Sequence, residues 1–177
     1  KNSIEEAHKA ILSDFGACDI LINGAGGNNP KATTDNEYFS SEDMGNIKTF
    51  FDLDKEGVEF VFNLNFLGTL LPTQVFAQDM LDKEDASIIN ISSMNAYRPL
   101  TKIPAYSAAK AGISNFTQWL AVHFAPCGIR CNAIAPGYIM TDMLKTVPQN
   151  LLDDFAKLTM LKRLGQPHEI ANAALFL

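Results

Sequence analysis

Three short apolar segments, each followed by small or polar residues, constrain the fold most strongly. They are Asp19–Asn23, Ile88–Ile91 and Arg130–Ile134. Helical patterns precede and separate these segments, and this alternation is typical of a doubly wound parallel sheet. Ligands of such sheets bind outside the carboxyl ends of the strands. We therefore predict an α/β fold whose site lies where Gly24, Ser93 and Pro136 follow the strands.

Tyr106 and Lys110 stand four residues apart in a predicted helix, 105–124, so their side chains share one face about one turn apart. A cation beside a phenol favours the phenolate, and at an effective dielectric of ~20 and ~4 Å the attraction is ~4 kcal/mol, or about three pKa units. We expect Lys110 to lower the pKa of Tyr106 toward the neutral range, where acid–base catalysis works best. Many helices carry such a pair by accident, so the position beside the strand ends is what makes this pair a candidate.

Composition and charge exclude several classes of protein. The 177 residues carry a net charge of −6 without a Lys/Arg cluster, which argues against a nucleic-acid partner. No apolar run reaches the length of a membrane span, and the N-terminus lacks signal-peptide blocks. Cys18, Cys127 and Cys131 show neither a disulfide pattern nor the further ligands of a metal site. We expect a cytoplasmic protein with no metal and no membrane partner.

Two segments follow the first strand. The stretch 28–53 is polar and irregular but carries two aromatic pairs, and a connection this long is uncommon in a compact domain. A substrate lid and a plain surface excursion fit it equally well. In the helical segment 54–80, Asn65 and Pro72 predict a kink. Asn65 among apolar neighbours is either a satisfied core amide or a functional one.

The helix 105–124 has two contrasting faces. One face carries the chemistry, with Tyr106, Lys110, Ile113 and Thr117. The other combines small residues with larger ones, namely Ala108, Gly112, Asn115, Trp119 and His123. Small residues beside a Trp suit close packing against another helix, including one from another subunit.

Several short motifs occur together in the order and register of a known family. They are Asn23-Gly-Ala-Gly26, Asn65-Phe-Leu-Gly68, Ser93 thirteen residues before Tyr106, Tyr106-x-x-x-Lys110, Pro136-Gly137 with Thr141, and Arg163-Leu-Gly-Gln-Pro167. On these residues the chain resembles the short-chain dehydrogenase/reductase family over essentially its whole length. Gly24 replaces the second Asn of the family's Asn-Asn-Ala-Gly. Each motif alone is weak, but all of them in register form a strong signal.

The resemblance implies a Rossmann-type NAD(P)-binding domain with a catalytic tetrad of Asn65, Ser93, Tyr106 and Lys110. Tyr106 would donate a proton to the carbonyl oxygen as hydride arrives, and Ser93 would hold that oxygen. Lys110 would also bind the nicotinamide ribose, and Asn65 would hold a proton-relaying water. Besides Tyr106 and Lys110, the implied cofactor contacts are Asn23, Gly24, Ala25, Gly26, Pro136, Gly137, Ile139 and Thr141. The cofactor is NAD or NADP, with NAD slightly favoured.

Part of the family pattern has no counterpart in these residues. Members begin with a strand, a Thr-Gly-x-x-x-Gly-x-Gly turn and a helix, and they end with a further strand. The glycine turn holds the cofactor pyrophosphate, and the residue that selects NAD or NADP follows the second strand. We therefore expect residues 1–177 to form a single partial domain that lacks the first strands and the last one. A strand from outside this segment should then pair with 19–23.

Within the family, the segment 23–34, the stretch 28–53 and Asn65–Pro72 resemble a sugar-acid branch of the mannonate oxidoreductase (fructuronate reductase) type. The segment after Thr141 is closer to generic sugar and gluconate dehydrogenases. We expect an NAD(P)-dependent interconversion of a secondary alcohol and a ketone on a sugar acid or polyol. Asn, Thr and Lys31 side chains of the 28–53 stretch would recognise this small-molecule substrate.

Two other functions remain open at this point. One is a 3-oxoacyl-thioester reductase of the same family, which the polar 28–53 stretch makes less attractive. The other is a non-catalytic, nucleotide-binding Rossmann scaffold, which would have no use for Ser93, Tyr106 and Lys110 together. The resemblance also implies a homotetramer that forms through helices 66–80 and 105–124.

Overall fold

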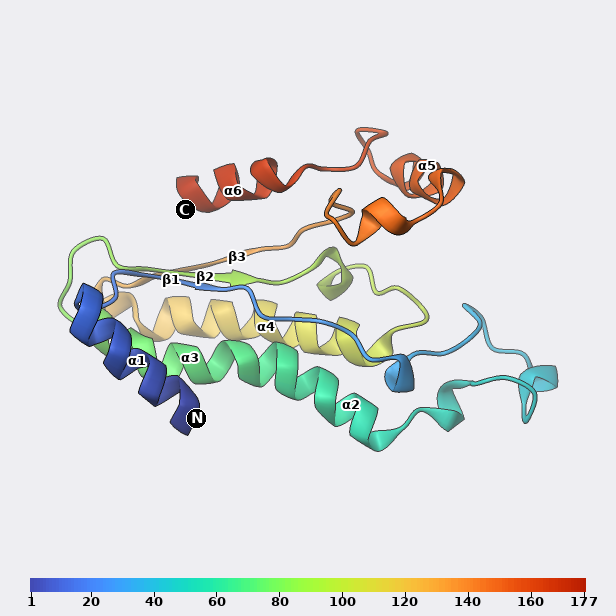
Figure 1. The fold of residues 1–177 in the computed structure, drawn as a ribbon, viewed down its shortest axis with the longest axis horizontal. Helices are drawn as coiled ribbons and strands as arrows, with labels where there is room; N and C mark the ends of the chain where they lie inside the picture. The colour runs from blue at the N-terminus through green and yellow to red at the C-terminus, as the bar shows by residue number, and fades with distance from the viewer.

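The computed structural model describes residues 1–177 and contains one sheet of three parallel strands in the order β1-β2-β3 (Figure 1). The strands are β1 (Ile20–Asn23), β2 (Ser87–Ile91) and β3 (Arg130–Ile134). Ser87 of β2 lies opposite both Ile20 and Arg130, so all three strands run in register. The predicted α/β fold with a parallel sheet is confirmed, with strand bounds within one residue.

Six α-helices accompany the sheet. They are α1 (Asn2–Phe15), α2 (Lys55–Phe62), α3 (Gly68–Phe76), α4 (Pro104–His123), α5 (Gln149–Leu158) and α6 (Pro167–Phe176). α4 begins at a proline, which suits the first turn of a helix because its missing N–H would have no partner there. The chain then turns at Gly128, whose φ of 75° lies in the left-handed region that favours glycine.

The helices form layers on the two sides of the sheet. Figure 1 shows α3 and α4 along one face and α5 and α6 on the other side. α3 contacts β1, and α4 contacts both β2 and β3. The main apolar core lies between these helices and the strands, and consists of Ala77, Met80, Ala86, Ile88, Leu120, Ile129 and Cys131. This packing fixes α4 against the strand ends.

β1 pairs with β2 along one edge, and no strand of the chain pairs with its other edge. Ile20 and Ile22 point away from the core and are 60% and 55% exposed. The apolar, uncovered strand that the sequence predicts is therefore present. The strand expected to pair with it stays a prediction.

The segment Lys55–Met80 is one long helical unit that changes its geometry in the middle. A π-helical turn, Asn63–Leu67, joins α2 to α3, close to the predicted kink at Asn65, and Pro72 lies inside α3. This unit is long and apolar enough, by length and composition alone, to cross a membrane. The expectation that no apolar run reaches that length is therefore wrong. A core helix has the same properties, and this one packs against β1 and α4.

The two faces of α4 are as the sequence predicts, with one correction. Lys110, Ile113 and Thr117 are buried, whereas Ala108 and Trp119 are exposed. Gly112 does not belong to the free face. A Cβ on Gly112 would lie 3.3 Å from Cδ2 of Phe66, so this glycine packs against the π-helical turn of its own chain.

Candidate active site

A cavity of about 760 Å³ opens at the carboxyl ends of all three strands. Its walls come from 24–28 after β1, 91–95 at the end of β2, and 136–144 after β3, together with α4 and the start of α6. The cavity lies at the edge where the sequence predicts the site, and its use as a binding site stays a prediction. Parallel strands produce this convergence because all of their carboxyl ends meet at one edge.

Ser93, Tyr106 and Lys110 all line this cavity. Tyr106 and Lys110 come from the first turns of α4, and Ser93 caps the 3-10 turn Met94–Ala96 by accepting the Asn95 N–H at 3.2 Å. The Lys110 ammonium donates to the carbonyl oxygen of Ile91 at 2.8 Å and lies 5.7 Å from the centroid of the Tyr106 ring. The loop after β2 and the helix α4 are therefore held together at the site itself.

The pKa values of this pair differ from the expectation. Burial raises the pKa of Tyr106 above its ordinary value of 10, although the nearby Ser93 hydroxyl acts to lower it. Burial also lowers the pKa of Lys110 from 10.5 to about 8. The prediction that the Tyr106 pKa is lowered by Lys110 is thus wrong, because burial of the phenol raises this pKa and the Ser93 hydroxyl, not Lys110, is the group that opposes the rise.

Asn65 is a fully buried amide with complete hydrogen bonding. Its Nδ2 donates to the carbonyl oxygens of Gly27 and Val61, both at 2.7 Å, and its Oδ1 accepts the Gly27 N–H at 3.2 Å. The side chain therefore fastens the loop after β1 to the π-helical turn. The backbone carbonyl of Asn65 accepts the Thr69 hydroxyl at 2.9 Å. Of the two interpretations that the sequence left open, the satisfied core amide describes the side chain, and the water relay stays a prediction.

Gly26 lies against the side chains of Asn65 and Lys110. A Cβ there would come within 2.8 Å of Asn65 Oδ1 and 2.9 Å of Lys110 Nζ, distances that real Cβ atoms essentially never show. Gly24, two residues earlier in the same loop, has nothing within 4 Å of the same position. The close approach of loop, amide and ammonium thus depends on the missing side chain of Gly26.

A chain of buried hydrogen bonds lies beneath the site. Asn23 Nδ2 donates to Thr73 Oγ1 at 3.0 Å and to Asn90 Oδ1 at 2.8 Å, and Asn90 Nδ2 donates to Thr117 Oγ1 at 2.9 Å. The chain joins β1 and β2 to α3 and α4 where the strands end. Asn90, Thr73 and Thr117 were not among the predicted site residues. The sequence feature that could have indicated this network is the polar Asn90 inside the apolar run Ile88–Ile91.

The wall after β3 is fixed by a second segment of the chain. Ile139 forms an isolated parallel bridge with Gly165, Met140 N–H donates to the Gly165 carbonyl at 2.8 Å, and Gly165 N–H donates to the Tyr138 carbonyl at 2.9 Å. Arg163 forms two hydrogen bonds with the Glu169 carboxylate, at 2.6 and 2.8 Å, and these hold the pKa of Glu169 at about 2. The late motif thus positions Ile139.

The structure brings most, but not all, of the predicted site residues to the cavity. The lining contains Gly24, Gly26, Ser93, Tyr106, Lys110, Pro136, Gly137, Ile139 and Thr141. It contains neither Asn23 nor Asn65, which are buried, nor Ala25, which is exposed outside the cavity. No group of three or more His, Cys, Asp or Glu side chains is arranged to hold a metal ion. The lining also includes polar residues that were not among the predicted site residues, among them Asn95.

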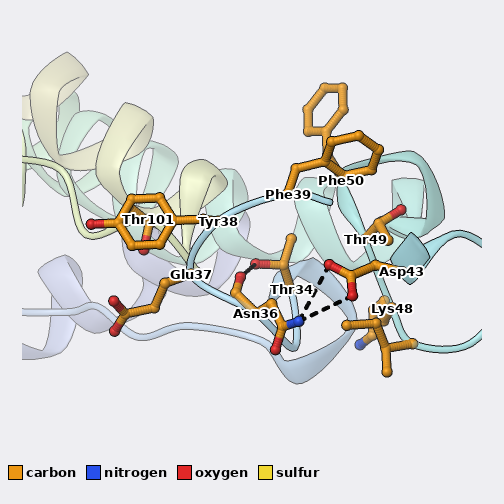
Figure 2. A pocket seen from close by; sticks show the side chains of 11 residues that line it. Thr34, Asn36, Glu37, Tyr38, Phe39, Asp43, Lys48, Thr49, Phe50 and Thr101 are labelled. Atoms are coloured by element: carbon orange, nitrogen blue, oxygen red, sulfur yellow. Dashed lines mark hydrogen bonds between the residues drawn. The ribbon is translucent and has the colours of Figure 1, made fainter. Parts of the chain in front are cut away.

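The stretch 28–53 contributes only Asn28 to the cavity and otherwise extends past the start of α2 (Figure 1). Lys31 pairs with Asp54 at 4.0 Å and Glu56 at 3.6 Å and does not line the cavity, so its role in substrate recognition stays a prediction. The stretch encloses a separate cavity of about 170 Å³, where Asn36 donates to both oxygens of Asp43 at 3.3 Å (Figure 2). The stretch also contacts the segment before α4, since the Thr34 N–H donates to the Lys102 carbonyl at 2.9 Å, and its role as a lid or as an excursion stays a prediction.

Comparisons with known proteins agree with this geometry. A family model described as enoyl-(acyl carrier protein) reductase matches residues 1–177. An uncharacterized oxidoreductase of Haemophilus influenzae is 59% identical over 99% of this chain and 64% of its own length. The uncharacterized oxidoreductase UxuB of Bacillus subtilis is 48% identical over 99% of this chain and 65% of its own length.

One solved structure is similar throughout the chain. It is a Haemophilus influenzae protein with bound NAD that is provisionally described as a D-mannonate oxidoreductase. It is 58% identical, with a TM-score of 0.93, over 99% of this chain and 65% of that one. The chain therefore spans slightly less than two thirds of the length of these relatives.

Proposed function

The chain belongs to the short-chain dehydrogenase/reductase family, and from this premise we propose that the protein transfers hydride between NAD and a secondary alcohol or ketone of a sugar acid. The observation that carries the proposal is the meeting of Ser93, Tyr106 and Lys110 on one wall of the 760 Å³ cavity. The similarity to a protein crystallised with NAD and provisionally described as a D-mannonate oxidoreductase supports the choice of cofactor and substrate class.

The walls of the cavity fit a nicotinamide cofactor. Lys110 donates one ammonium hydrogen to the Ile91 carbonyl, which leaves two hydrogens that can bond to ribose hydroxyls. Ile91 and Ile139 give the cavity apolar surface suited to a flat ring. The absence of a side chain at Gly26 lets a ligand approach the loop closely. NAD, when bound, would supply the hydride-accepting carbon.

The residues of this chain then divide the remaining work. Tyr106 holds the proton that the substrate oxygen gains or loses, because its phenol lines the cavity and stays protonated at neutral pH. Ser93, whose hydroxyl neighbours the Tyr106 phenol in the same cavity, orients the same oxygen. Lys110 places a positive charge beside both groups, which stabilises negative charge on the oxygen during transfer.

Two other functions receive less support. The family model is described as an enoyl-(acyl carrier protein) reductase, and for this reason the substrates to be tested include a thioester. Relatives with 48–59% identity are described only as oxidoreductases, and the similar crystal structure points to a sugar acid. A non-catalytic scaffold would not need a serine, a tyrosine and a lysine on one cavity wall.

We also propose a cytoplasmic homotetramer. The three cysteines are free thiols, as is common in a reducing compartment. A shallow apolar groove of about 310 Å³ runs between α3 and α4, and Trp119 beside it is 54% exposed and stacked on His123 at 4.4 Å. A second copy of the chain that contacts this groove through helices 66–80 and 105–124 would bury it.

The proposal is tested with the full-length protein, NAD, and a panel of aldonates, neutral polyols and 3-hydroxyacyl thioesters, with NADH formation as the measured quantity. We expect an aldonate to give the highest kcat/KM. Tyr106→Phe should lower kcat by about 10²- to 10⁴-fold, because it removes the transferable proton and keeps the ring. Tyr97→Phe is the matched control, since Tyr97 is 71% exposed and outside the cavity. Equal loss in both variants, or preference for a thioester, would contradict the proposal.

A further inference from the structure

Three buried side chains carry a polar atom without any hydrogen-bond partner. These atoms are Ser87 Oγ, Asn95 Oδ1 and Ser107 Oγ. Buried polar atoms are almost always paired, because an unpaired one keeps the full cost of leaving water. Only Asn95 belongs to the wall of the large cavity, and its side chain is 4% exposed. Asn95 is therefore the one of these three residues that borders the space a substrate would enter.

The backbone holds Asn95 rigidly beside the reacting group. Asn95 lies in the 3-10 turn Met94–Ala96, and its N–H donates to Ser93 Oγ at 3.2 Å. The N–H of Met94 donates to the Pro136 carbonyl at 2.9 Å, which ties the turn to the loop after β3. The side chain of Asn95 is thereby fixed two residues from the serine that orients the substrate oxygen.

We propose that Asn95 is a specificity residue that hydrogen-bonds a substrate hydroxyl on a carbon next to the one that exchanges hydride. The inference rests on the proposed function and names the part of the substrate that this site recognises. A hydroxyl both donates and accepts, so it can satisfy the carboxamide oxygen of Asn95. A carboxylate can only accept, and it would repel that oxygen. An acyl thioester without a neighbouring hydroxyl would leave the oxygen unpaired.

The charges of the cavity agree with this assignment. Among the lining residues, Lys110 is the only charged side chain, and its ammonium is hydrogen-bonded to the Ile91 carbonyl. Close to the reacting carbon, polar recognition therefore falls to neutral groups such as Asn95 and Ser93. A site with a buried group that needs a substrate hydroxyl rejects an analogue that lacks this hydroxyl, because the group stays unpaired.

The test compares an aldonate substrate with two deoxy analogues, each lacking the hydroxyl on one carbon beside the reacting carbon. Full-length wild type, Asn95→Leu, Asn95→Ala and Ser107→Ala are assayed for kcat/KM with NAD, and thermal melting confirms that each variant folds. We expect wild type to discriminate against one deoxy analogue by about 10- to 100-fold. Both Asn95 variants should lose this discrimination by slowing the aldonate alone. Ser107→Ala removes an orphan atom outside the cavity and should keep it.

Each outcome separates this inference from the proposed function. If the Asn95 variants slow the aldonate and both analogues equally, Asn95 is a packing residue and the inference is wrong, while the sugar-acid function stands. If wild type oxidises neutral polyols and not aldonates, the substrate class is wrong, and a polyol with its deoxy analogues tests Asn95 in the same way. Failure to oxidise any hydroxylated substrate would overturn both.

Discussion

Gly26→Ala tests whether the loop after β1 and the catalytic amine share one tightly packed contact. The added methyl would lie 2.8 Å from Asn65 Oδ1 and 2.9 Å from Lys110 Nζ. Neither side chain can swing freely, since Asn65 makes three hydrogen bonds and Lys110 is bonded to the Ile91 carbonyl. We therefore expect the amide and the ammonium to move together.

The size of the effect follows from the bonds that would break. Displacing the Asn65 amide leaves the N–H and the carbonyl of Gly27 without partners, and each such group costs about 1–3 kcal/mol when buried. We expect the free energy of unfolding to fall by roughly 2–4 kcal/mol, because the loop can relax in part. A shift of the Lys110 amine by a fraction of an ångström should lower kcat by about 10- to 100-fold.

Gly24→Ala is the matched control in the same loop. Nothing lies within 4 Å of its Cβ position, and neither Gly24 nor Gly26 has a positive φ, so the two variants differ only in available space. Urea unfolding gives the stability of both full-length variants, and NADH formation gives kcat. If Gly26→Ala matched Gly24→Ala in both measurements, the argument from close packing would be refuted.

Three further predictions follow from other parts of the structure. Asn90→Leu should lower the free energy of unfolding by about 2–4 kcal/mol, because it leaves Asn23 and Thr117 without their buried partner. Urea titration measures this change, and an unchanged midpoint would show that the chain of hydrogen bonds is not stabilising. Ala108→Arg, on the exposed face of α4, should reduce the mass measured by light scattering without lowering the melting temperature, whereas a full-size tetramer would move the interface elsewhere. The kcat of ketone reduction should not change with pH up to about pH 8, the pKa of Lys110, and should fall above it. The kcat of alcohol oxidation should rise up to that pH and then level off. Identical pH profiles for the two directions would contradict these protonation states.

Periodicity and strand-end chemistry were enough to predict the sheet and the edge at which the large cavity opens. The apolar runs determine which segments are strands, and parallel pairing then brings Gly24, Ser93 and Pro136 to one edge. The same logic placed Tyr106 and Lys110 on the buried face of α4. These predictions depend only on local pattern and on the general geometry of parallel sheets, so no knowledge of individual contacts was needed.

Properties that depend on a particular neighbour were not predictable. The sequence does not show whether the amide of a buried Asn is fully hydrogen-bonded, as in Asn65, or has an unpaired oxygen, as in Asn95. The direction of the Tyr106 pKa shift depends on the burial of the phenol, which raises this pKa and which the Tyr-x-x-x-Lys spacing does not reveal. The stretch 28–53 has no periodicity, so the sequence could not show that Lys31 binds Asp54 and Glu56 instead of facing the cavity.

The opposite pKa shifts of Tyr106 and Lys110 define how the folded site handles protons. Below about pH 8 the lysine is charged and the phenol is protonated, which is the state needed to give a proton to a ketone oxygen. Alcohol oxidation needs the phenolate, whose population rises with pH because the raised pKa lies above the working range. Above about pH 8 Lys110 loses the charge that stabilises either oxyanion, so the gain in phenolate is offset. Desolvation therefore gives the folded chain a bias toward proton donation at neutral pH, and Ser93 is the one neighbour whose hydrogen bonding to Tyr106 opposes that bias.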